Sequence, residues 1–398
     1  MDTINANLEQ PPITALSLPF KKLASLPVPL SCIQCIVHKN EIIICGGYEN
    51  NDCYSYDISK DQYKRICSYP NDVRLRGHSV VKRVDNEKSR EIVLLSFGGL
   101  HKHTLMMRYR SVWEDEQDDI AIHCNKWYPF TNNANESISI GRDEDIYIGM
   151  RAVIGGSNNH LLFISYYPKN LDVFNLITFQ FVKHDTLPTH DSIGYHCFVS
   201  KAANGLQTIT TNKIKNEMVL FCNNVGLSIE YDEDNCTFQF EKLRVCTTIR
   251  SIERYAYVQV NNDDILFFGG WDSYLGIVSK GVYKYSIHER KWMKFEYNLP
   301  TPLSDCVVIL SEDNTCMHIL GGKGKKNASL LTHIKTKVKN WMKEETEKEK
   351  QWIIEERRIE DAEKEIAELK TVKNEIENMK QDLNLKKLKV IYYLFLFV

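Results

Sequence analysis

The sequence predicts an all-β protein, a six-bladed β-propeller with four-stranded blades, followed by a long C-terminal α-helix. Three recurring patterns predict this fold. The phrase LPVPLS at Leu26 returns as LPTPLS at Leu299. Apolar runs that end in a double glycine recur at Gly47, Gly99, Gly270 and Gly322. Pairs of large residues seven positions apart form the third pattern. The patterns agree on a period of about 55 residues, which divides the chain into six units.

The residue pairs indicate how the second half of each unit is folded. Their members are Tyr56 and Tyr63, Ile120 and Trp127, Phe174 and Phe181, Tyr231 and Phe238, Tyr285 and Trp292, and Ile334 and Trp341. Turn-forming polar residues stand between the members, as in YDISKDQY and YSIHERKW. Each pair is therefore expected to face across a tight hairpin that joins the third strand to the fourth.

The other two patterns predict the first half of each unit. The first strand follows the LP phrase, and the second is the apolar run that ends in the double glycine. Because this second strand is apolar at nearly every position, both of its faces are expected to be buried between neighbouring blades. Glycines at its end permit positive φ where the chain turns outward. The LP phrase is expected at the passage between blades, so that its two copies build the same corner five blades apart.

These features resemble the kelch family. Residues 265–292, ILFFGGWDSYLGIVSKGVYKYSIHERKW, carry the double glycine, the tyrosine before the hairpin and the tryptophan seven positions later. RLRGHSVV, residues 74–81, is similar to the start of a kelch blade. The resemblance covers about residues 20–341 and implies a propeller but no particular ligand, because kelch propellers serve many purposes. The third and fourth units depart from the pattern, since LLFISYYP and MVLFCNN lack the double glycine.

A propeller must join its last blade to its first. FKKLASLP, residues 20–27, has the pattern of a fourth strand with no preceding three, so it is predicted to close the ring as the outer strand of the sixth blade. Closure by the segment around Trp341 is the alternative. The predicted domains are a flexible N-terminal segment at 1–19, the propeller at 20–341, a helical coiled-coil arm at 342–389 and an apolar tail at 390–398. The tail is too short to cross a bilayer, and a misplaced gene end is our preferred explanation for it.

The arm is predicted to be one helix of about 70 Å. It is rich in charge, with 12 Lys or Arg and 14 Asp or Glu between Trp341 and Lys389. The residues expected to form its coiled-coil seam are Ile359, Ala362, Ile366, Leu369, Ile376 and Leu383. Ile359 and Ile366 begin a line of residues seven positions apart that continues with Lys373 and Lys380. Apolar Val372 and Met379 stand one position before these lysines. A homodimer is the preferred prediction, and a heterologous coiled coil or a single solvated helix are the alternatives.

The predicted function is that of a non-catalytic scaffold for a partner protein of unknown identity. In a propeller, the loops after the second strands gather on one face, around the mouth of the central channel. The residues of that face predicted to bind a partner are Tyr48, His101, His103, Trp271, Tyr274, Lys323, Lys325 and Lys326. Aromatic and basic side chains on a rigid platform suit recognition of a peptide or an acidic segment.

A metal-dependent enzyme is the alternative function. Asp115, Asp119 and His123 stand at helical spacing and resemble, with Asp in place of the first Glu, the iron motif of the nitrile-specifier kelch proteins. Galactose-oxidase-like enzymes share the blade architecture, but no motif here places paired Tyr and His ligands for copper. Because IAIHCNKW has the pattern of a strand, which would separate His123 from the carboxylates, no metal or other cofactor is predicted.

Composition and charge argue against several other classes of function. The net charge of −2 provides no global positive field for nucleic acid. The 12 irregularly spaced cysteines and the absence of an apolar leader predict reduced thiols and a cytoplasmic protein. The single CxxC, Cys32 to Cys35, is expected to be two small core residues. No apolar run is long enough to predict a transmembrane helix.

Overall fold

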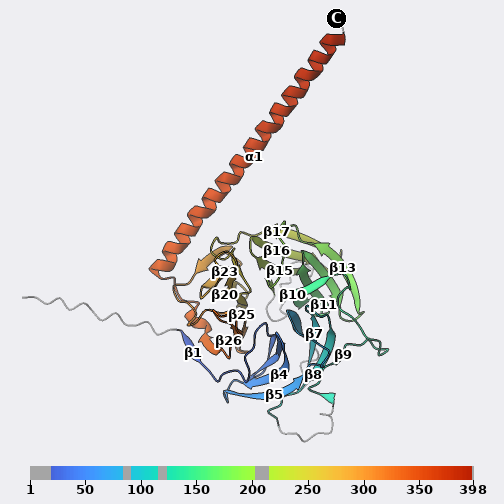
Figure 1. Cartoon of the computed structure of the whole chain (residues 1–398), viewed down its shortest axis with the longest axis vertical. Coiled ribbons are helices and arrows are strands. Elements are labelled where there is room, and N and C mark those ends of the chain that lie inside the picture. Colours follow the sequence, from blue (N-terminus) through green and yellow to red (C-terminus); the bar gives the residue numbers. More distant parts are fainter. Residues whose placement is uncertain (1–18, 84–90, 115–122, 202–214, 397–398) are drawn as a thin grey trace, which may run out of the picture. The chain divides into compact units, whose positions relative to one another are not determined.

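The computed structural model describes residues 19–83, 91–114, 123–201 and 215–396. The chain forms two compact units, residues 1–344 and 345–398. The first unit is a multi-bladed β-propeller, with its sheets arranged around a central axis (Figure 1). The second contains one α-helix.

Six antiparallel sheets of the described chain have four strands each. In hydrogen-bonded order, the first three are β2 (Cys35–His38), β3 (Glu41–Gly47), β4 (Asn50–Asp57) and β5 (Gln62–Ser68); β6 (His78–Arg83), β7 (Ile92–Gly98), β8 (Thr104–Tyr109) and β9 (Tyr128–Pro129); and β10 (Ile146–Gly155), β11 (Leu161–Tyr167), β12 (Asn170–Asn175) and β13 (Gln180–Thr186). The others are β14 (Cys197–Ser200), β15 (Lys215–Cys222), β16 (Val225–Asp232) and β17 (Thr237–Lys242); β19 (Ala256–Val260), β20 (Asp264–Phe268), β23 (Val282–Ser286) and β24 (Lys291–Lys294); and β25 (Ser304–Leu310), β26 (Cys316–Lys323), β27 (His333–Lys337) and β1 (Phe20–Lys22).

A smaller sheet has three strands, in the order β18 (Ile252–Glu253), β21 (Trp271–Asp272) and β22 (Ile277–Val278). In the chain, β21 and β22 lie between β20 and β23, and β18 lies just before β19. The double glycine after β20 is thus followed by a short hairpin. This hairpin was not among the predicted strands.

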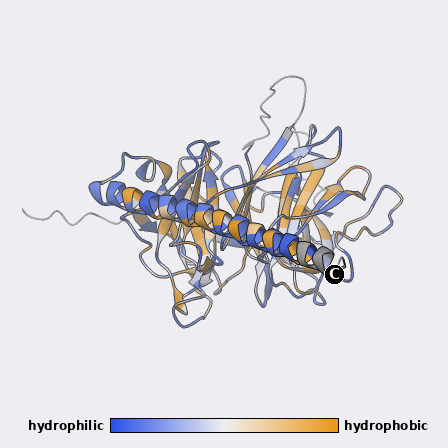
Figure 2. Ribbon diagram, turned by 90° about the horizontal axis from the view of Figure 1, so that it is seen from above, coloured by the Kyte–Doolittle hydropathy of each residue, from blue (hydrophilic) through white to orange (hydrophobic). Residues whose placement is uncertain are grey.

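The second strand of a sheet packs against both neighbouring sheets. In β3, Ile43 and Cys45 belong to the apolar cluster shared with β6–β8, whereas Ile42 and Ile44 belong to the cluster shared with β26. Leu94 of β7 and Phe97 on its other face are divided in the same way between two clusters. Figure 2 shows the hydrophobic residues concentrated in the strands of the propeller. The prediction that both faces of the second strand are buried is confirmed.

The seven-residue pairs mark real hairpins in four sheets. The directly opposed residues are Tyr56 and Tyr63, Phe174 and Phe181, Tyr231 and Phe238, and Tyr285 and Trp292. Their ring centroids lie between 4.8 and 5.2 Å apart. Rings at this separation attract each other beyond the area that they bury. These four pairs confirm the predicted hairpins between the third and fourth strands.

The two copies of the LP phrase build the same corner. The carbonyl oxygen of Leu30, in the first copy, accepts the N–H of Gly322 at 2.9 Å. The carbonyl oxygen of Leu303, at the same place in the second copy, accepts the N–H of Gly270 at 2.7 Å. Both leucines are fully buried. Each phrase therefore joins the double glycine of one sheet to the first strand of the next, which explains why the sequence repeats it.

The second sheet differs from its prediction. Its third strand is β8, and not a strand ending at Ile120, a residue outside the described part of the chain. Trp127, the expected partner of Ile120, instead stacks on Tyr69, with 4.5 Å between the ring centroids. In the described part of this sheet, the fourth strand pairs instead with residues of β8, Leu105 with Pro129 and Met106 with Tyr128.

The last sheet combines strands from both ends of the propeller. Phe20, Lys21 and Lys22 of β1 pair with β27. The third strand β27 is followed by a 3₁₀-helix, η3 (Val338–Asn340), rather than by a fourth strand. Trp341, which was predicted in a strand position, is instead buried after this helix, with Phe20 at 5.5 Å and Phe295 at 4.9 Å between ring centroids.

The second unit consists of α1 (Glu347–Leu396), which has 50 residues. It begins five residues later than predicted because Thr346 and Glu349 form a capping box. The Thr346 hydroxyl accepts the N–H of Glu349, and the Glu349 carboxylate accepts the N–H of Thr346. The helix continues through most of the stretch predicted as a separate apolar tail. No helix in the described part of the chain is both long and apolar enough to span a membrane.

Candidate functional site

Six residues with left-handed backbone surround the channel of the propeller. Each lies at or near the beginning of the first strand of a four-stranded sheet, and their φ angles range from +51° to +69°. The six residues are Cys32, Gly77, Gly149, Tyr195, Arg254 and Asp305. For a residue with a side chain this conformation costs about 1 kcal/mol or more, and such strain concentrates at functional sites. The four non-glycine members therefore direct attention to the channel mouth.

Backbone hydrogen bonds connect these six residues in two arcs. In one arc, the N–H of Cys32 donates to the carbonyl of Asp305, and the N–H of Asp305 donates to the carbonyl of Arg254. In the other, Tyr195 donates to Gly149, which donates to Gly77. The four distances lie between 2.7 and 3.0 Å. Successive sheets are thus held together at the channel by their own backbone, so side chains on these residues have fixed positions.

The channel itself holds a cavity of about 190 Å³. It is lined by residues near the first strand of all six four-stranded sheets, among them Gln34, Ser79, Arg151, Tyr195, Tyr257 and Val307. Ligand pockets for drug-sized molecules are usually larger, about 300–1,000 Å³. The cavity therefore has room for a small group or a single side chain.

One buried carboxylate at the mouth is shared by two cations. The Asp305 side chain is 2% exposed and lies 3.6 Å from an Arg254 nitrogen and 3.9 Å from Lys323 Nζ. It also accepts a hydrogen bond from the Cys32 thiol at 3.4 Å. Burial first, and the Asp305 charge second, raise the pKa of Cys32 to about 12. Cys32 therefore remains a thiol at neutral pH, whereas a nucleophilic cysteine needs the thiolate.

Aromatic rings hold the cations of the mouth in place. The Arg254 guanidinium lies 4.9 Å from the ring centroid of Tyr195, and Lys323 Nζ lies 4.9 Å from that of Tyr48. Exposed Arg76 lies 5.5 Å from the Tyr48 ring. A hydrogen bond with Glu49 raises the pKa of the Tyr48 hydroxyl. Cation–π contacts of this kind order charged side chains without neutralising them.

The predicted partner-binding residues separate into different groups. Tyr48 and Lys323 meet at the channel mouth, beside a hollow of about 540 Å³ that both of them line. His101, Lys325 and Lys326 are exposed. Trp271 is half-buried in the three-stranded sheet, and Tyr274, 88% exposed, lies between the two strands of its hairpin.

His103 does not belong to an exposed binding face. Its Nε2 is bonded to the Ser96 hydroxyl at 2.8 Å, and its ring lies 5.8 Å from those of Tyr69 and His78. Burial lowers the pKa of His103 to about 4. The side chain therefore turns inward and stabilises the second sheet, although its place in the sequence falls in the loop after β7.

Three further histidines are buried in the fold, His78 beside His103 and the other two in the last sheet. Burial is the first cause that lowers the pKa of His78 to about 3, of His318 to about 4 and of His333 to about 3. Nδ1 of His318 bonds Nε2 of His333 at 2.9 Å, and the Tyr63 hydroxyl bonds His333 Nδ1 at 2.6 Å. These rings are neutral hydrogen-bonding groups of the fold at physiological pH.

Acid is expected to destabilise the fold through these histidines. Histidines of the unfolded chain take up protons near pH 6.5, whereas the four folded ones resist protonation until about pH 3–4. The unfolded state thus binds more protons within this window, so the free energy of unfolding falls as the pH falls. We expect a loss of more than about 3 kcal/mol between pH 7 and pH 5, since each histidine contributes up to about 1.4 kcal/mol per pH unit.

Urea unfolding at half-unit pH steps measures this loss. Replacing buried His318 by glutamine should flatten the pH dependence. A free energy of unfolding that stays constant from pH 7 to pH 5 would show the prediction to be wrong.

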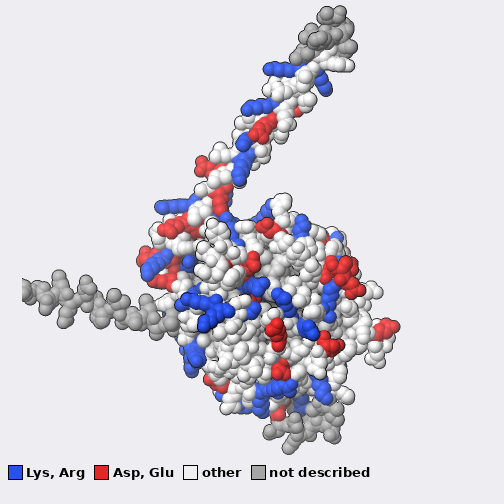
Figure 3. Space-filling model, viewed as in Figure 1, with Lys and Arg blue, Asp and Glu red and all other residues white. Residues whose placement is uncertain are grey.

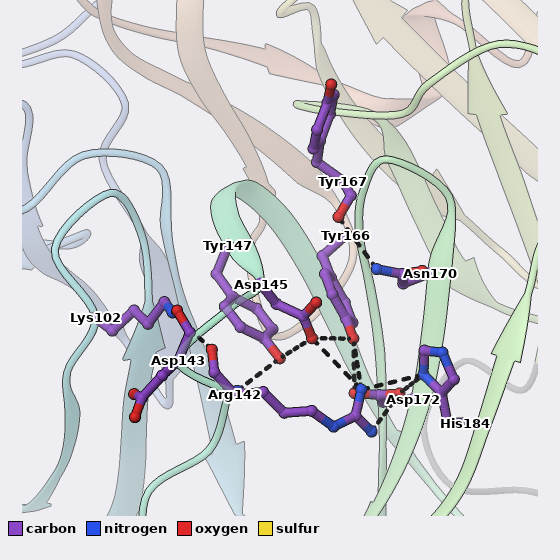
Figure 4. A network of polar contacts seen from close by, with 10 residues as sticks. All are labelled: Lys102, Arg142, Asp143, Asp145, Tyr147, Tyr166, Tyr167, Asn170, Asp172 and His184. Carbon is purple, nitrogen blue, oxygen red and sulfur yellow. Dashed lines mark hydrogen bonds and ion pairs between the residues drawn. The ribbon is translucent and has the colours of Figure 1, made fainter.

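A second polar cluster lies in the third sheet (Figure 4). The buried Asp172 carboxylate lies 2.6 Å from His184 Nδ1 and 3.4 Å from Arg142, and the Tyr166 hydroxyl donates to it at 3.1 Å. Tyr166 also bonds Asp145 at 2.8 Å. The carboxylate, the histidine, the arginine and the tyrosine of this cluster are side chains that also occur together in active sites. Because the groups use one another as partners, the cluster is best explained as an internal support of this sheet.

The alternative metal site falls largely outside the described residues. Asp115 and Asp119 lie outside the described part of the chain, and His123 is exposed. Within the part that is described, no three His, Cys, Asp or Glu side chains are placed to hold a metal ion.

Sequence reasoning missed Arg76, Arg254, Asp305 and Tyr195. It considered the loops after the second strands, whereas these residues precede or begin first strands. One signal was present: Cys32 and Asp305 directly follow the two copies of the LP phrase and so occupy equivalent places. Their φ angles are +51° and +53°.

Comparison with known proteins supports the fold. No family model and no curated protein matches the sequence. Among solved structures, the chain is similar to the structure of YjhT, with a TM-score of 0.54, 13% sequence identity, and coverage of 80% of this chain and 98% of that one. At this level of identity the similarity shows the β-propeller fold alone.

Proposed function

We propose that the chain is a six-bladed, kelch-type β-propeller that acts as a non-catalytic interaction scaffold in the cytoplasm. Its channel mouth binds an acidic peptide segment of a partner protein, and its C-terminal helix mediates association. The observation that carries this proposal is the sharing of one buried carboxylate, Asp305, by Arg254 and Lys323. Two cations on one carboxylate leave a positive charge that a ligand can neutralise.

The blade number is supported by the backbone of the channel. Each of the six four-stranded sheets contributes one left-handed residue there. The three-stranded sheet is built from a loop hairpin and the segment before β19, so we count it as a decoration of one blade. The kelch assignment is supported by the double glycines that meet the LP corners and by the opposed pair of Tyr285 and Trp292.

An acidic peptide fits the mouth better than a large substrate does. Arg76 and Lys323 flank the Tyr48 ring, and Arg254 lies over Tyr195, so cations and aromatic faces alternate across the mouth. The cavity below, about 190 Å³, has room for one carboxylate side chain. Charge-assisted hydrogen bonds from arginine to a carboxylate are among the stronger polar contacts in proteins.

The non-catalytic and cytoplasmic parts rest on side-chain chemistry. The Cys32 thiol at the mouth is protonated, and the buried histidines are neutral and engaged with one another or with hydroxyl and carbonyl groups. All 12 cysteines are free thiols, although Cys53 stands directly opposite both Cys45 and Cys67 on neighbouring strands. Unpaired thiols in such positions are typical of a reducing compartment.

Binding of a fluorescein-labelled glutamate-rich decapeptide tests the proposal by fluorescence anisotropy. We expect the full chain to bind it, with affinity that falls as salt is added. Arg76→Glu should weaken binding by about tenfold or more, because the exposed Arg76 side chain would face the acidic ligand and its reversal introduces repulsion.

The matched control is Lys242→Glu, the same kind of charge reversal at an exposed position on the outer strand β17. This variant should bind like the unchanged chain. Equal affinity for a lysine-rich decapeptide, or an Arg76→Glu variant that binds normally, would refute recognition of acidic segments at the mouth.

A further inference from the structure

Helix α1 carries a line of exposed apolar side chains. They are Ile359, Ile366, Leu369, Val372, Ile376, Met379 and Leu383, and each is between 41% and 65% exposed. Figure 2 shows hydrophobic bands between hydrophilic stretches along the ribbon of this helix. Helices with such a narrow stripe bury it against another helix.

The spacing of this stripe contains one change of phase. Counting the smaller Ala362, the residues Ile359, Ala362, Ile366 and Leu369 follow the alternating three and four spacing of a heptad repeat. Leu369 to Val372 is a second step of three in succession, and the alternation then continues to Leu383. A shift of this kind overwinds a coiled coil locally but does not end it. Lys386 takes the next place in the seam and terminates it.

The phase shift changes the role of two lysines. Without it, Lys373 and Lys380 would stand in the seam and would face their own copies in a parallel homodimer. With it, Val372 and Met379 occupy the seam, and both lysines move to the position beside it. Residues beside the seam, at heptad positions e and g, determine the partner and the orientation of a coiled coil.

The flanking charges on the two sides of the seam are complementary. In a parallel, in-register pair, each g residue faces the e residue five positions later on the other helix. The resulting pairs are Arg358 with Glu363, Glu365 with Lys370, Glu368 with Lys373, Glu375 with Lys380, and Asp382 with Lys387. All five pairs unite opposite charges. Figure 3 shows the acidic and basic side chains along the helix.

We infer that α1 binds α1 of a second copy of this chain as a parallel, in-register coiled coil with its phase shift at Leu369. An antiparallel pair would place g against g and e against e. After the shift, the g residues Glu368, Glu375 and Asp382 are all acidic, and the e residues Lys373, Lys380 and Lys387 are all basic. Like charges would then face each other, so charge selects the parallel orientation.

The inference deepens the proposed function, because the arm was proposed there to mediate association without a stated partner. A dimer carries two channel mouths on one molecule. Two mouths that engage two segments of one partner, or two copies of it, gain affinity through effective concentration. The coiled coil itself does not depend on what the mouth binds.

Charge exchange in the full-length chain tests the pairing by sedimentation equilibrium. One variant carries Glu368→Lys, Glu375→Lys and Asp382→Lys, and the other carries Lys373→Glu, Lys380→Glu and Lys387→Glu. Each alone should raise the dimer dissociation constant by about a hundredfold or more, because every one of these pairs becomes repulsive in both halves of the dimer. An equimolar mixture should restore a heterodimer. The control, Glu360→Lys with Glu377→Lys, changes charge away from the seam and should remain dimeric.

A disulfide reports the orientation. Ala362→Cys places a thiol in the seam, and a parallel, in-register dimer should oxidise to a covalent dimer on a non-reducing gel. Lys364→Cys, on the outer face, should not exceed the background of the unchanged chain.

Three results would overturn the inference: a monomeric full-length chain at 100 μM, charge variants that dimerise alone but do not exchange, or equal crosslinking of the two cysteine variants. Loss of peptide binding with the dimer intact would instead count against the channel mouth alone.

Discussion

Replacing Gly269 by alanine is expected to lower the free energy of unfolding by about 4 kcal/mol or more. Gly269 has a φ of +64°, and an added Cβ would lie 2.2 Å from the carbonyl oxygen of Leu303. That oxygen accepts the N–H of Gly270 at 2.7 Å. The methyl group therefore displaces the LP corner and breaks the hydrogen bond that joins two sheets. Urea unfolding followed by tryptophan fluorescence measures the loss.

Gly276→Ala is the matched control. Its φ is +66°, nearly the same as that of Gly269, but an added Cβ would meet nothing within 4 Å. This variant should lose only about 1 kcal/mol, the cost of left-handed backbone for a residue with a side chain. The difference between the two variants isolates the close approach to Leu303. If both alanines cost the same, the corner is not the constraint that fixes Gly269.

The propeller was predictable because its assembly imposes the same local demand repeatedly. A hairpin between the third and fourth strands needs two large residues at a fixed spacing, and Tyr285 and Trp292 meet that demand as Tyr56 and Tyr63 do. A corner that approaches a double glycine needs the buried leucine of the LP phrase. The hairpin demand acts between residues close in sequence, and the corner demand returns where one sheet passes to the next, so both leave a repeated trace in the sequence.

The departures arose where a residue satisfies its demand with a distant partner. Trp127 has the right spacing from Ile120 but stacks on Tyr69, from the preceding sheet. Trp341 has the spacing of a fourth-strand residue but packs on Phe20, whose strand takes that place. The start of α1 differs for another reason: the local capping box of Thr346 and Glu349 sets it, five residues after the predicted start.

The channel mouth was less predictable than the blades for a geometric reason. Six of its members come from the beginnings of first strands, which are spread over more than 270 residues between Cys32 and Asp305. The packing of two sheets brings Arg254, just before β19, to the Asp305 carboxylate of β25, and Lys323 reaches it from the paired strand β26. The sequence singled out Lys323 as a binding residue, but it gave no reason to place Arg254 and Asp305 beside it.

Deleting residues 2–27 is expected to remove about 5 kcal/mol or more of stability, because this segment supplies the outer strand of the sheet that contains β25, β26 and β27. Phe20 to Lys22 pair with β27, and the N–H of Leu23 continues this contact by donating to His333 at 3.0 Å. Leu23 and Leu26 are buried in the apolar cluster shared with β3. Burying a leucine contributes about 2 kcal/mol, and the lost strand also exposes the unpaired edge of β27.

Thermal unfolding of the deletion variant, which keeps its start methionine, measures this loss of stability. Deletion of residues 2–18 is the control, because it removes none of the contacts described for the sheet. The two deletions separate closure by the N-terminal strand from closure by the segment around Trp341. If Trp341 and η3 were sufficient to cover β27, the longer deletion would unfold at the temperature of the full chain. Because Phe20 forms part of the packing around Trp341, at 5.5 Å, removing the strand should also loosen that tryptophan. The longer deletion should therefore unfold well below the control and change its tryptophan fluorescence before global unfolding.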